Sequence, residues 1–188
     1  MFVASARGTP SGDDSLRVTS PREGVSAPRD KGGSGRPSVW GVVKAVGALL
    51  VLLLLLAAVT SVTGLALFAL PFVATAALVA MAPAAPFAQP RSIVVGHLSA
   101  TALALGATAV AGPSVWTAAV ATALSLAPML LLRAPHPPAA ATAALVGLTA
   151  PAPLYLLTPV LAASALVIVA GLVLGRALPG HAYPASWR

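Results

Sequence analysis

Apolar residues fill positions 39–177 almost without interruption, and four isolated cations divide that stretch. Residues 45–90, 92–132 and 134–175 contain no Asp, Glu, Lys or Arg. A single helix over the first of these runs would be about 70 Å long, more than twice the hydrocarbon thickness of a bilayer of about 30 Å. Each run therefore predicts two helical segments joined by a turn. The cations that separate the runs are Lys44, Arg91, Arg133 and Arg176.

Glycine and proline mark a turn within each run. The predicted breaks are Thr63-Gly64, Gly112-Pro113 and Pro151-Ala152-Pro153. Residues 139–150 would span only about 18 Å as a helix, so we expect a half-helix or re-entrant segment there. The predicted fold is all-α: a polytopic helical membrane protein with four to six hydrophobic segments, some broken by proline or re-entrant. The expected segments are 40–62, 65–82, 92–111, 114–132, 139–150 and 154–175.

Residues 1–38 differ from the rest in composition. They hold all four acids of the chain and are rich in Ser, Gly, Pro and Arg. Such a segment cannot bury enough apolar surface to offset its chain entropy, so we predict a disordered N-terminal tail. A transit peptide is the alternative, although the acids argue against it. The remaining assignments are a helical transmembrane domain at 39–177 and a short C-terminal tail at 178–188.

The positions of the cations predict the orientation of the chain. Lys and Arg in short loops are retained on the cytoplasmic side. The basic tail, Arg91, Arg133 and Arg176 fall on one side if every run forms a hairpin, whereas Arg176 changes side if 139–150 does not cross. We predict an integral protein of the bacterial cytoplasmic membrane with its N-terminus inside. A bundle this small encloses little space, so we also predict a homo-oligomer in the lipid bilayer.

Composition excludes several functions. The chain has 188 residues with 11 Lys and Arg, 4 Asp and Glu, and no Cys. Disulfides and thiol chemistry are therefore absent, and three histidines alone make a weak ligand set, so we predict no metal and no cofactor. The membrane part has no paired carboxylates, no Ser-His-acid triad and no phosphate loop, so we predict that the protein is not an enzyme. The net charge of +7 reflects missing acids, and we predict no nucleic-acid partner.

Two polar motifs lie beside predicted helix starts: Gln89-Pro90-Arg91, followed by Gly96-His97, and Arg133-Ala134-Pro135-His136-Pro137-Pro138. Proline suits the first turn of a helix, and Ser92 is placed to cap the third segment. Helix N-termini present unpaired N–H groups and a partial positive charge, which attract anions. We therefore predict an anion site where the two motifs meet. The candidate substrate-binding residues are Gln89, Arg91, His97, Arg133, His136 and Thr142, and the structural residues of the motifs are Pro90, Gly96, Pro137 and Pro138.

Each candidate also has a plainer interpretation. Arg91 and Arg133 at turns can serve only to set topology. His136 between prolines can cap or bend a turn. His97 shares a helix face with Thr101, which favours close helix packing over a polar path, although an ionisable group inside a membrane helix is a functional candidate. Proton coupling would have to use His97 or His136, because an unperturbed imidazole titrates near pH ~6.5.

The second motif, His136-Pro137-Pro138-Ala139-Ala140-Ala141-Thr142, follows Ala88-Gln89-Pro90-Arg91 and Gly96-His97. In order and spacing these motifs resemble the HPP family of integral membrane proteins, which is named for its His-Pro-Pro signature. The resemblance covers about residues 42–176. The chain departs from it at Ala140 and Ser92, where family members often have Gly and Asn.

The resemblance implies a small four-helix membrane protein that acts as a transporter, with plant and cyanobacterial relatives linked to nitrite. Four helices are fewer than the segments counted above. An acid-free membrane domain with basic turns is compatible with a small anion. We therefore predict a small membrane transporter or channel for a small anion, with nitrite as the substrate that the resemblance implies. The alternative is a non-transporting membrane subunit or scaffold that packs against a partner membrane protein.

Overall fold

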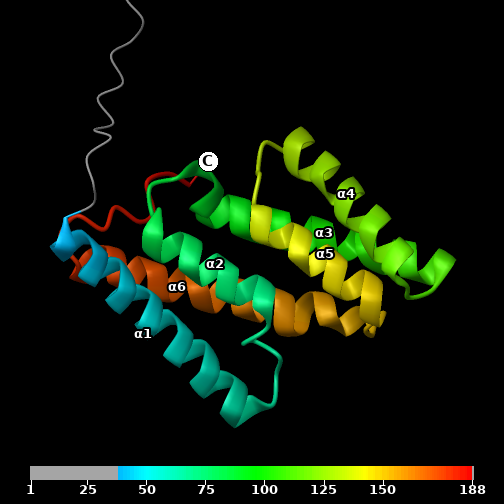
Figure 1. Cartoon of the computed structure of the whole chain (residues 1–188), viewed down its shortest axis with the longest axis horizontal. Coiled ribbons are helices and arrows are strands. Elements are labelled where there is room, and N and C mark those ends of the chain that lie inside the picture. Colours follow the sequence, from blue (N-terminus) through cyan, green and yellow to red (C-terminus); the bar gives the residue numbers. More distant parts are fainter. Residues whose placement is uncertain (1–37, 188) are drawn as a thin grey trace, which may run out of the picture. The chain divides into compact units, whose positions relative to one another are not determined.

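The computed structural model describes residues 38–187, so the predicted N-terminal tail lies outside the described residues except for Ser38. Every regular element in this range is helical, which confirms the all-α prediction (Figure 1). The α-helices are α1 Val39–Thr63, α2 Leu70–Met81, α3 Pro90–Ala111, α4 Val115–Leu131, α5 Pro137–Thr149 and α6 Ala162–Ala177. The short helical turns are η1 Pro86–Ala88, η2 Pro153–Leu156 and η3 Leu157–Leu161.

The helices end where glycine and proline predict. Gly64 ends α1 with a φ of 71°, and its N–H donates to the Thr60 carbonyl over 2.9 Å. Gly112 ends α3 with the same φ. These left-handed conformations favour glycine because it has no Cβ. At the third break, Ala150 follows α5 with a φ of 42°, and the chain turns through Pro151 to Pro153 before α6.

The start of α3 differs from the prediction. Gln89, not Ser92, occupies the N-cap position, because Pro90 is the first helical residue. Ser92 lies inside the helix, where its hydroxyl donates to the Pro86 carbonyl over 2.9 Å. The expected cap at Ser92 is therefore wrong, and the serine instead ties η1 to the first turn of α3.

Helix length separates two groups of helices. Among residues 38–187, three helical stretches are long and apolar enough to cross a bilayer: Val39–Thr63, Pro90–Ala111 and Pro153–Ala177. The helices α2, α4 and α5 are shorter, with 12, 17 and 13 residues. Residues 38–187 thus hold six α-helices, because each of the three apolar runs breaks once, at Gly64, Gly112 and Pro151.

Two apolar clusters hold the bundle together. One joins α1, α2, α3 and α6 through large side chains such as Leu52, Phe72 and Val167. The other joins α3, α4 and α5 mainly through small residues, among them Ala104 and Ala143. Small residues let helix backbones approach closely in a membrane. The large apolar side chains that remain exposed lie mainly on α1 and α4 and face the surroundings of the bundle, which in a membrane are lipid.

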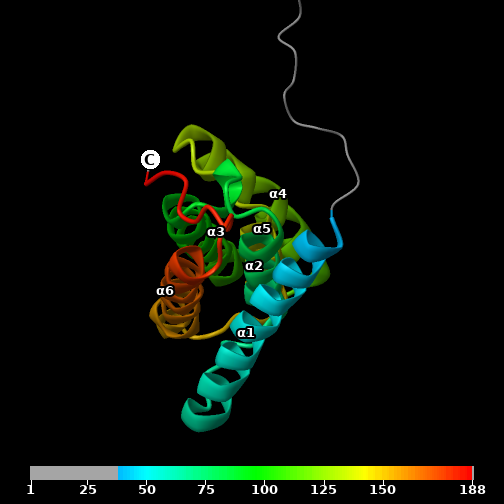
Figure 2. The same ribbon diagram turned by 90° about the vertical axis from the view of Figure 1, so that its left-hand side faces the viewer.

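Several chain segments meet at one end of the bundle (Figures 1 and 2). The Lys44 ammonium, near the start of α1, donates to the Pro179 carbonyl, just after α6, over 3.0 Å. The Arg91 guanidinium, at the start of α3, donates to the carbonyls of Leu132 and Arg133. Arg176 lies in the last turn of α6. The cations of the described chain therefore gather at the end where α1, α3 and α5 begin and α6 ends.

Candidate functional site

His97 of α3 and His136 at the start of α5 lie side by side in the interior. Their ring centroids are 4.8 Å apart, and both side chains are fully buried. Gly96 makes this approach possible, because a Cβ at that position would lie 2.6 Å from the His136 Cβ. The Phe72 ring covers the His97 imidazole at a centroid distance of 5.2 Å. The two polar motifs of the sequence thus meet at their histidines.

A third residue, Thr75 of α2, joins the two rings. Its Oγ1 is 2.9 Å from His97 Nε2 and 3.0 Å from His136 Nε2. Thr75 is not among the candidate residues predicted from the sequence. The signal that could have found it is its isolation, since Thr75 is the one polar side chain in the apolar segment 65–82.

Two further contacts complete a hydrogen-bonded chain across four elements. Thr142 Oγ1 of α5 lies 2.8 Å from His97 Nδ1. His136 Nδ1 lies 2.7 Å from the Phe87 carbonyl oxygen of η1. The order of groups is Thr142, His97, Thr75, His136 and the Phe87 carbonyl. This series of hydrogen bonds therefore connects α5, α3, α2 and η1 through side chains that are widely separated in sequence.

The Phe87 carbonyl determines which atom donates in each of these hydrogen bonds, because a carbonyl oxygen can only accept. His136 must donate from Nδ1, and a neutral ring then accepts at Nε2 from the Thr75 hydroxyl. The Thr75 oxygen accepts from His97 Nε2, and His97 Nδ1 accepts from Thr142. Both rings are neutral in this arrangement, and each of their nitrogens has a partner.

A second arrangement holds one more proton. Thr75 Oγ1 also lies 2.9 Å from the Pro71 carbonyl oxygen. When the hydroxyl hydrogen turns to that carbonyl, the Thr75 oxygen can accept from both Nε2 atoms. His136 then donates from both nitrogens and is an imidazolium. Uptake of one proton at His136 Nε2, together with rotation of the Thr75 hydroxyl hydrogen, thus converts the neutral cluster into a singly protonated form, and every ring nitrogen keeps a partner in both forms.

The N-terminus of α5 does not supply the anion-binding N–H groups expected from the sequence. Pro137 and Pro138 have no N–H, and the Ala139 N–H donates to the His136 carbonyl over 2.9 Å. None of the first three residues of α5 therefore has a free donor. At this helix start, hydrogen bonds to an anion would have to come from imidazole N–H groups, and the expectation of a backbone N–H site is wrong for α5.

The two arginines lie away from the histidines. The Arg91 guanidinium binds the Leu132 and Arg133 carbonyls at 2.6 Å and 3.0 Å, where it caps the end of α4. The Arg133 side chain is exposed, and its backbone has a φ of 51°. Arg91 precedes His97 by six residues, which is about 9 Å along the helix. The structure therefore brings His97, His136 and Thr142 together and leaves both arginines at the end of the bundle.

Gln89 holds the C-terminal segment. Its Nε2 donates to the carbonyls of Pro83 and Ala85 at 2.9 Å and 2.8 Å, and its Oε1 accepts from the N–H groups of Ala185 and Ser186. The side chain is buried and all of these contacts are to backbone. Gln89 thus anchors residues 185–186 to the connection between α2 and α3. Of the prolines in the two motifs, Pro90 and Pro138 are buried, and Pro137 is exposed.

Replacing Gln89 by leucine is expected to release the C-terminal segment while the helices persist. Each lost hydrogen bond is worth about 1 kcal/mol net, so amide exchange at Ala185 and Ser186 should accelerate about tenfold or more. Hydrogen exchange in detergent, read by mass spectrometry on peptides from 178–187, measures this. Gln89→Glu is the matched control, because it keeps the acceptor for both amides. Unchanged exchange in Gln89→Leu would show that other contacts hold the segment.

Helices of spanning length, apolar outer faces and a buried polar junction define a polytopic helical membrane protein. The sequence pattern described as "HPP, transmembrane region" matches residues 34–184. The chain therefore belongs to the HPP family, and it is an integral membrane protein in contact with the lipid bilayer. Comparisons with curated proteins and with solved structures found no match.

Proposed function

We propose that this protein is a transporter for a small anion that crosses the membrane together with a proton. The observation that carries the proposal is the geometry of the His97–Thr75–His136 junction, which offers every ring nitrogen a hydrogen-bond partner both in the neutral form and with one added proton. His136 holds the added proton, and the Thr75 hydroxyl rotates to accommodate it. The junction contains no carboxylate, and we propose no catalysed reaction for it.

The charge balance of the chain favours an anion as the companion of this proton. Residues 31–188 contain no Asp or Glu that could pair with a protonated His136. An unpaired charge in an apolar interior is strongly unfavourable. A small anion beside the imidazolium removes that cost, so proton and anion bind more readily together than either does alone. Nitrite is the substrate to test first, because the family resemblance implies it.

Access to the junction requires a rearrangement. Both rings are fully buried, which corresponds to a closed state. The contact that seals them is the approach of α5 to α3 at Gly96, together with Thr75 of α2. An anion reaches His136 when α2 or the start of α5 moves away from α3. Arg91 and Arg133, at the end of the bundle, attract the anion towards this junction without binding it there.

The test is nitrite-driven proton movement into liposomes that contain the purified full chain and an internal pH dye. An inward nitrite gradient should acidify the interior faster than in empty vesicles, and the rate should saturate with nitrite. Nitrous acid itself crosses bilayers, so empty vesicles set the background. His136→Gln is the matched variant, because its amide can make the neutral hydrogen bonds but cannot take up a proton. We expect its rate to equal the background.

Two results would contradict the proposal. Acidification no faster than in empty vesicles, with folded protein, would favour the alternative of a non-transporting membrane subunit. Saturable nitrite entry that His136→Gln leaves unchanged would show that transport does not use this proton site.

A further inference from the structure

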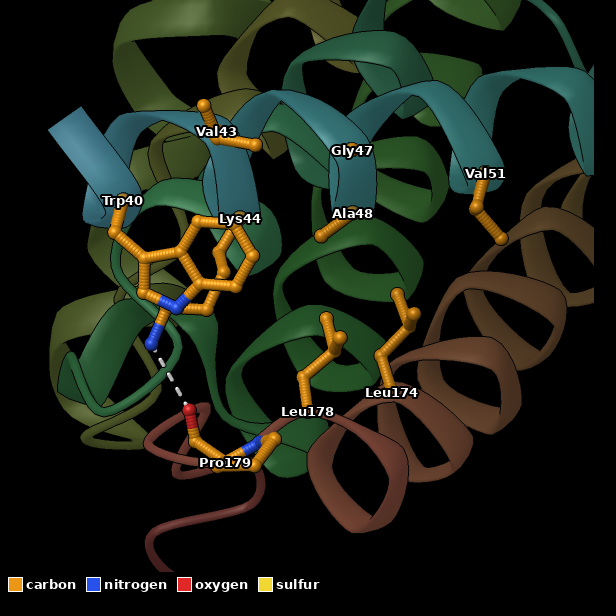
Figure 3. A pocket seen from close by; sticks show the side chains of 9 residues that line it. All are labelled: Trp40, Val43, Lys44, Gly47, Ala48, Val51, Leu174, Leu178 and Pro179. Atoms are coloured by element: carbon orange, nitrogen blue, oxygen red, sulfur yellow. Dashed lines mark hydrogen bonds between the residues drawn. The ribbon is translucent and has the colours of Figure 1, made fainter.

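An open apolar groove runs between α1 and the end of α6 (Figure 3). Its volume is about 440 Å³. Along α1 it extends from Trp40 to Val51, which is about 17 Å at the helical rise. Leu174 and Leu178 form the opposite wall. The groove is therefore long and narrow, with hydrocarbon walls, on the side of α1 that packs against α6.

The groove ends at a cation. Among the described residues that line it, Lys44 alone is charged. Its ammonium donates to the Pro179 carbonyl over 3.0 Å, and since an ammonium has three donors, two are available to another acceptor. Trp40 lies one helical turn before Lys44 on the same face of α1. Trp and snorkelling Lys side chains lie at the level of the lipid head groups in membrane proteins.

A smaller pocket of about 170 Å³ adjoins this end and shares Lys44 with the groove. His181 lines it, and within residues 38–187 the buried His181 Nε2 has no hydrogen-bond partner. Burial lowers the pKa of His181, and the nearby Lys44 ammonium lowers this pKa further. The ring is therefore uncharged at neutral pH, and the pocket combines one cation with an unpartnered imidazole nitrogen.

We propose that this groove binds an anionic phospholipid, with one acyl chain between α1 and α6 and the phosphate-bearing head group at Lys44 and His181. The apolar walls match an acyl chain, and the free donors of Lys44 match phosphate oxygens. No acid in residues 31–188 repels the anion. A zwitterionic lipid would bring its own cation close to Lys44, so the site prefers a net negative head group. The site is separate from the histidine junction and does not depend on the proposed transport.

The test uses Trp40 as a reporter inside the groove. The chain has three tryptophans, and Trp40 is the only one that remains after the substitutions Trp116→Phe and Trp187→Phe. The full-length protein is reconstituted in phosphatidylcholine vesicles that contain brominated phosphatidylglycerol or brominated phosphatidylcholine. We expect brominated phosphatidylglycerol to quench Trp40 fluorescence at a several-fold lower mole fraction than brominated phosphatidylcholine. Equal quenching by the two lipids would overturn the proposal, as would relief of the quenching by inorganic phosphate.

Two variants assign the preference to charge and to shape. Lys44→Gln can keep the hydrogen bond to Pro179 but loses the cation, and it should remove the preference that Lys44→Arg retains. Gly47→Leu places a side chain in the groove, and the position has open space for it, since an added Cβ meets nothing within 4 Å. It should weaken quenching by both lipids. A preference that survives both Lys44→Gln and Gly47→Leu would overturn the assignment to this groove.

Discussion

Replacing Thr75 by valine is expected to reduce proton-linked nitrite uptake to the rate of empty vesicles. Valine has nearly the shape of threonine but no hydroxyl, so His97 Nε2 and His136 Nε2 both lose the partner that lies within 3.0 Å. The proton can then no longer be accommodated by rotation of a hydroxyl hydrogen. Each buried nitrogen left without a partner also costs about 1–3 kcal/mol of stability.

The measurement is the rate of internal acidification in liposomes, with the midpoint of thermal unfolding in detergent taken on the same preparations. Thr75→Ser keeps a hydroxyl, and we expect it to retain most of the uptake. A loss of about tenfold or more in Thr75→Val corresponds to at least about 1.4 kcal/mol in the barrier to uptake.

Thr101→Val is the matched control for the loss of a buried hydroxyl. The Thr101 hydroxyl donates to the backbone carbonyl of His97 over 2.7 Å, whereas the ring nitrogens of His97 and His136 have Thr75, Thr142 and the Phe87 carbonyl as partners. Thr101→Val should therefore transport like the parent. Normal uptake by folded Thr75→Val would remove Thr75 from the mechanism, and equal losses in Thr75→Val and Thr101→Val would indicate a general effect of packing.

Local chemistry explains which parts of the fold could be predicted. Gly64 and Gly112 end helices through their own backbone preferences, and Pro151 and Pro153 lie in the break between α5 and η2, so the breaks are visible in the sequence. The missing donors at the start of α5 were visible as well, since Pro137 and Pro138 have no N–H in any conformation. The anion expectation at that helix failed because it used the general rule for helix ends without this exception.

The composition of the site depends on contacts that no local pattern contains. Thr75 lies 22 residues from His97 and 61 from His136 in the chain, and the three meet because α2 packs against α5, which in turn packs against α3. The same holds for Arg91, whose guanidinium caps the end of α4 rather than facing the histidines. Residue type and motif spacing identified the two imidazoles, whereas the partner that links them follows from packing.

A backbone contact between α4 and α5 leads to the second large effect. Gly147 of α5 lies against Ala118 of α4, and an added Cβ would overlap the Ala118 Cα and lie 2.9 Å from the Ala118 nitrogen. Backbone atoms cannot rotate aside as side chains do, so Gly147→Ala must separate the two helices. Overpacking of this kind costs about 1–3 kcal/mol, and we expect the upper end of that range. The Ser114 N–H would also lose its 3.1 Å hydrogen bond to the Gly147 carbonyl.

Gly106→Ala supplies the matched comparison, because Gly106 is also inside a helix but an added Cβ there meets nothing within 4 Å. It should leave stability unchanged or raise it by up to about 1 kcal/mol, since alanine is the better helix former. Unfolding of both variants in mixed micelles by increasing SDS measures the difference. Because α5 carries Thr142 and directly follows His136, the shift of α5 in Gly147→Ala should disturb the histidine junction and reduce uptake as well. Equal stability of the two variants would mean that α4 and α5 are not in backbone contact. Packing against α4 would then not explain why α5 lies beside His97.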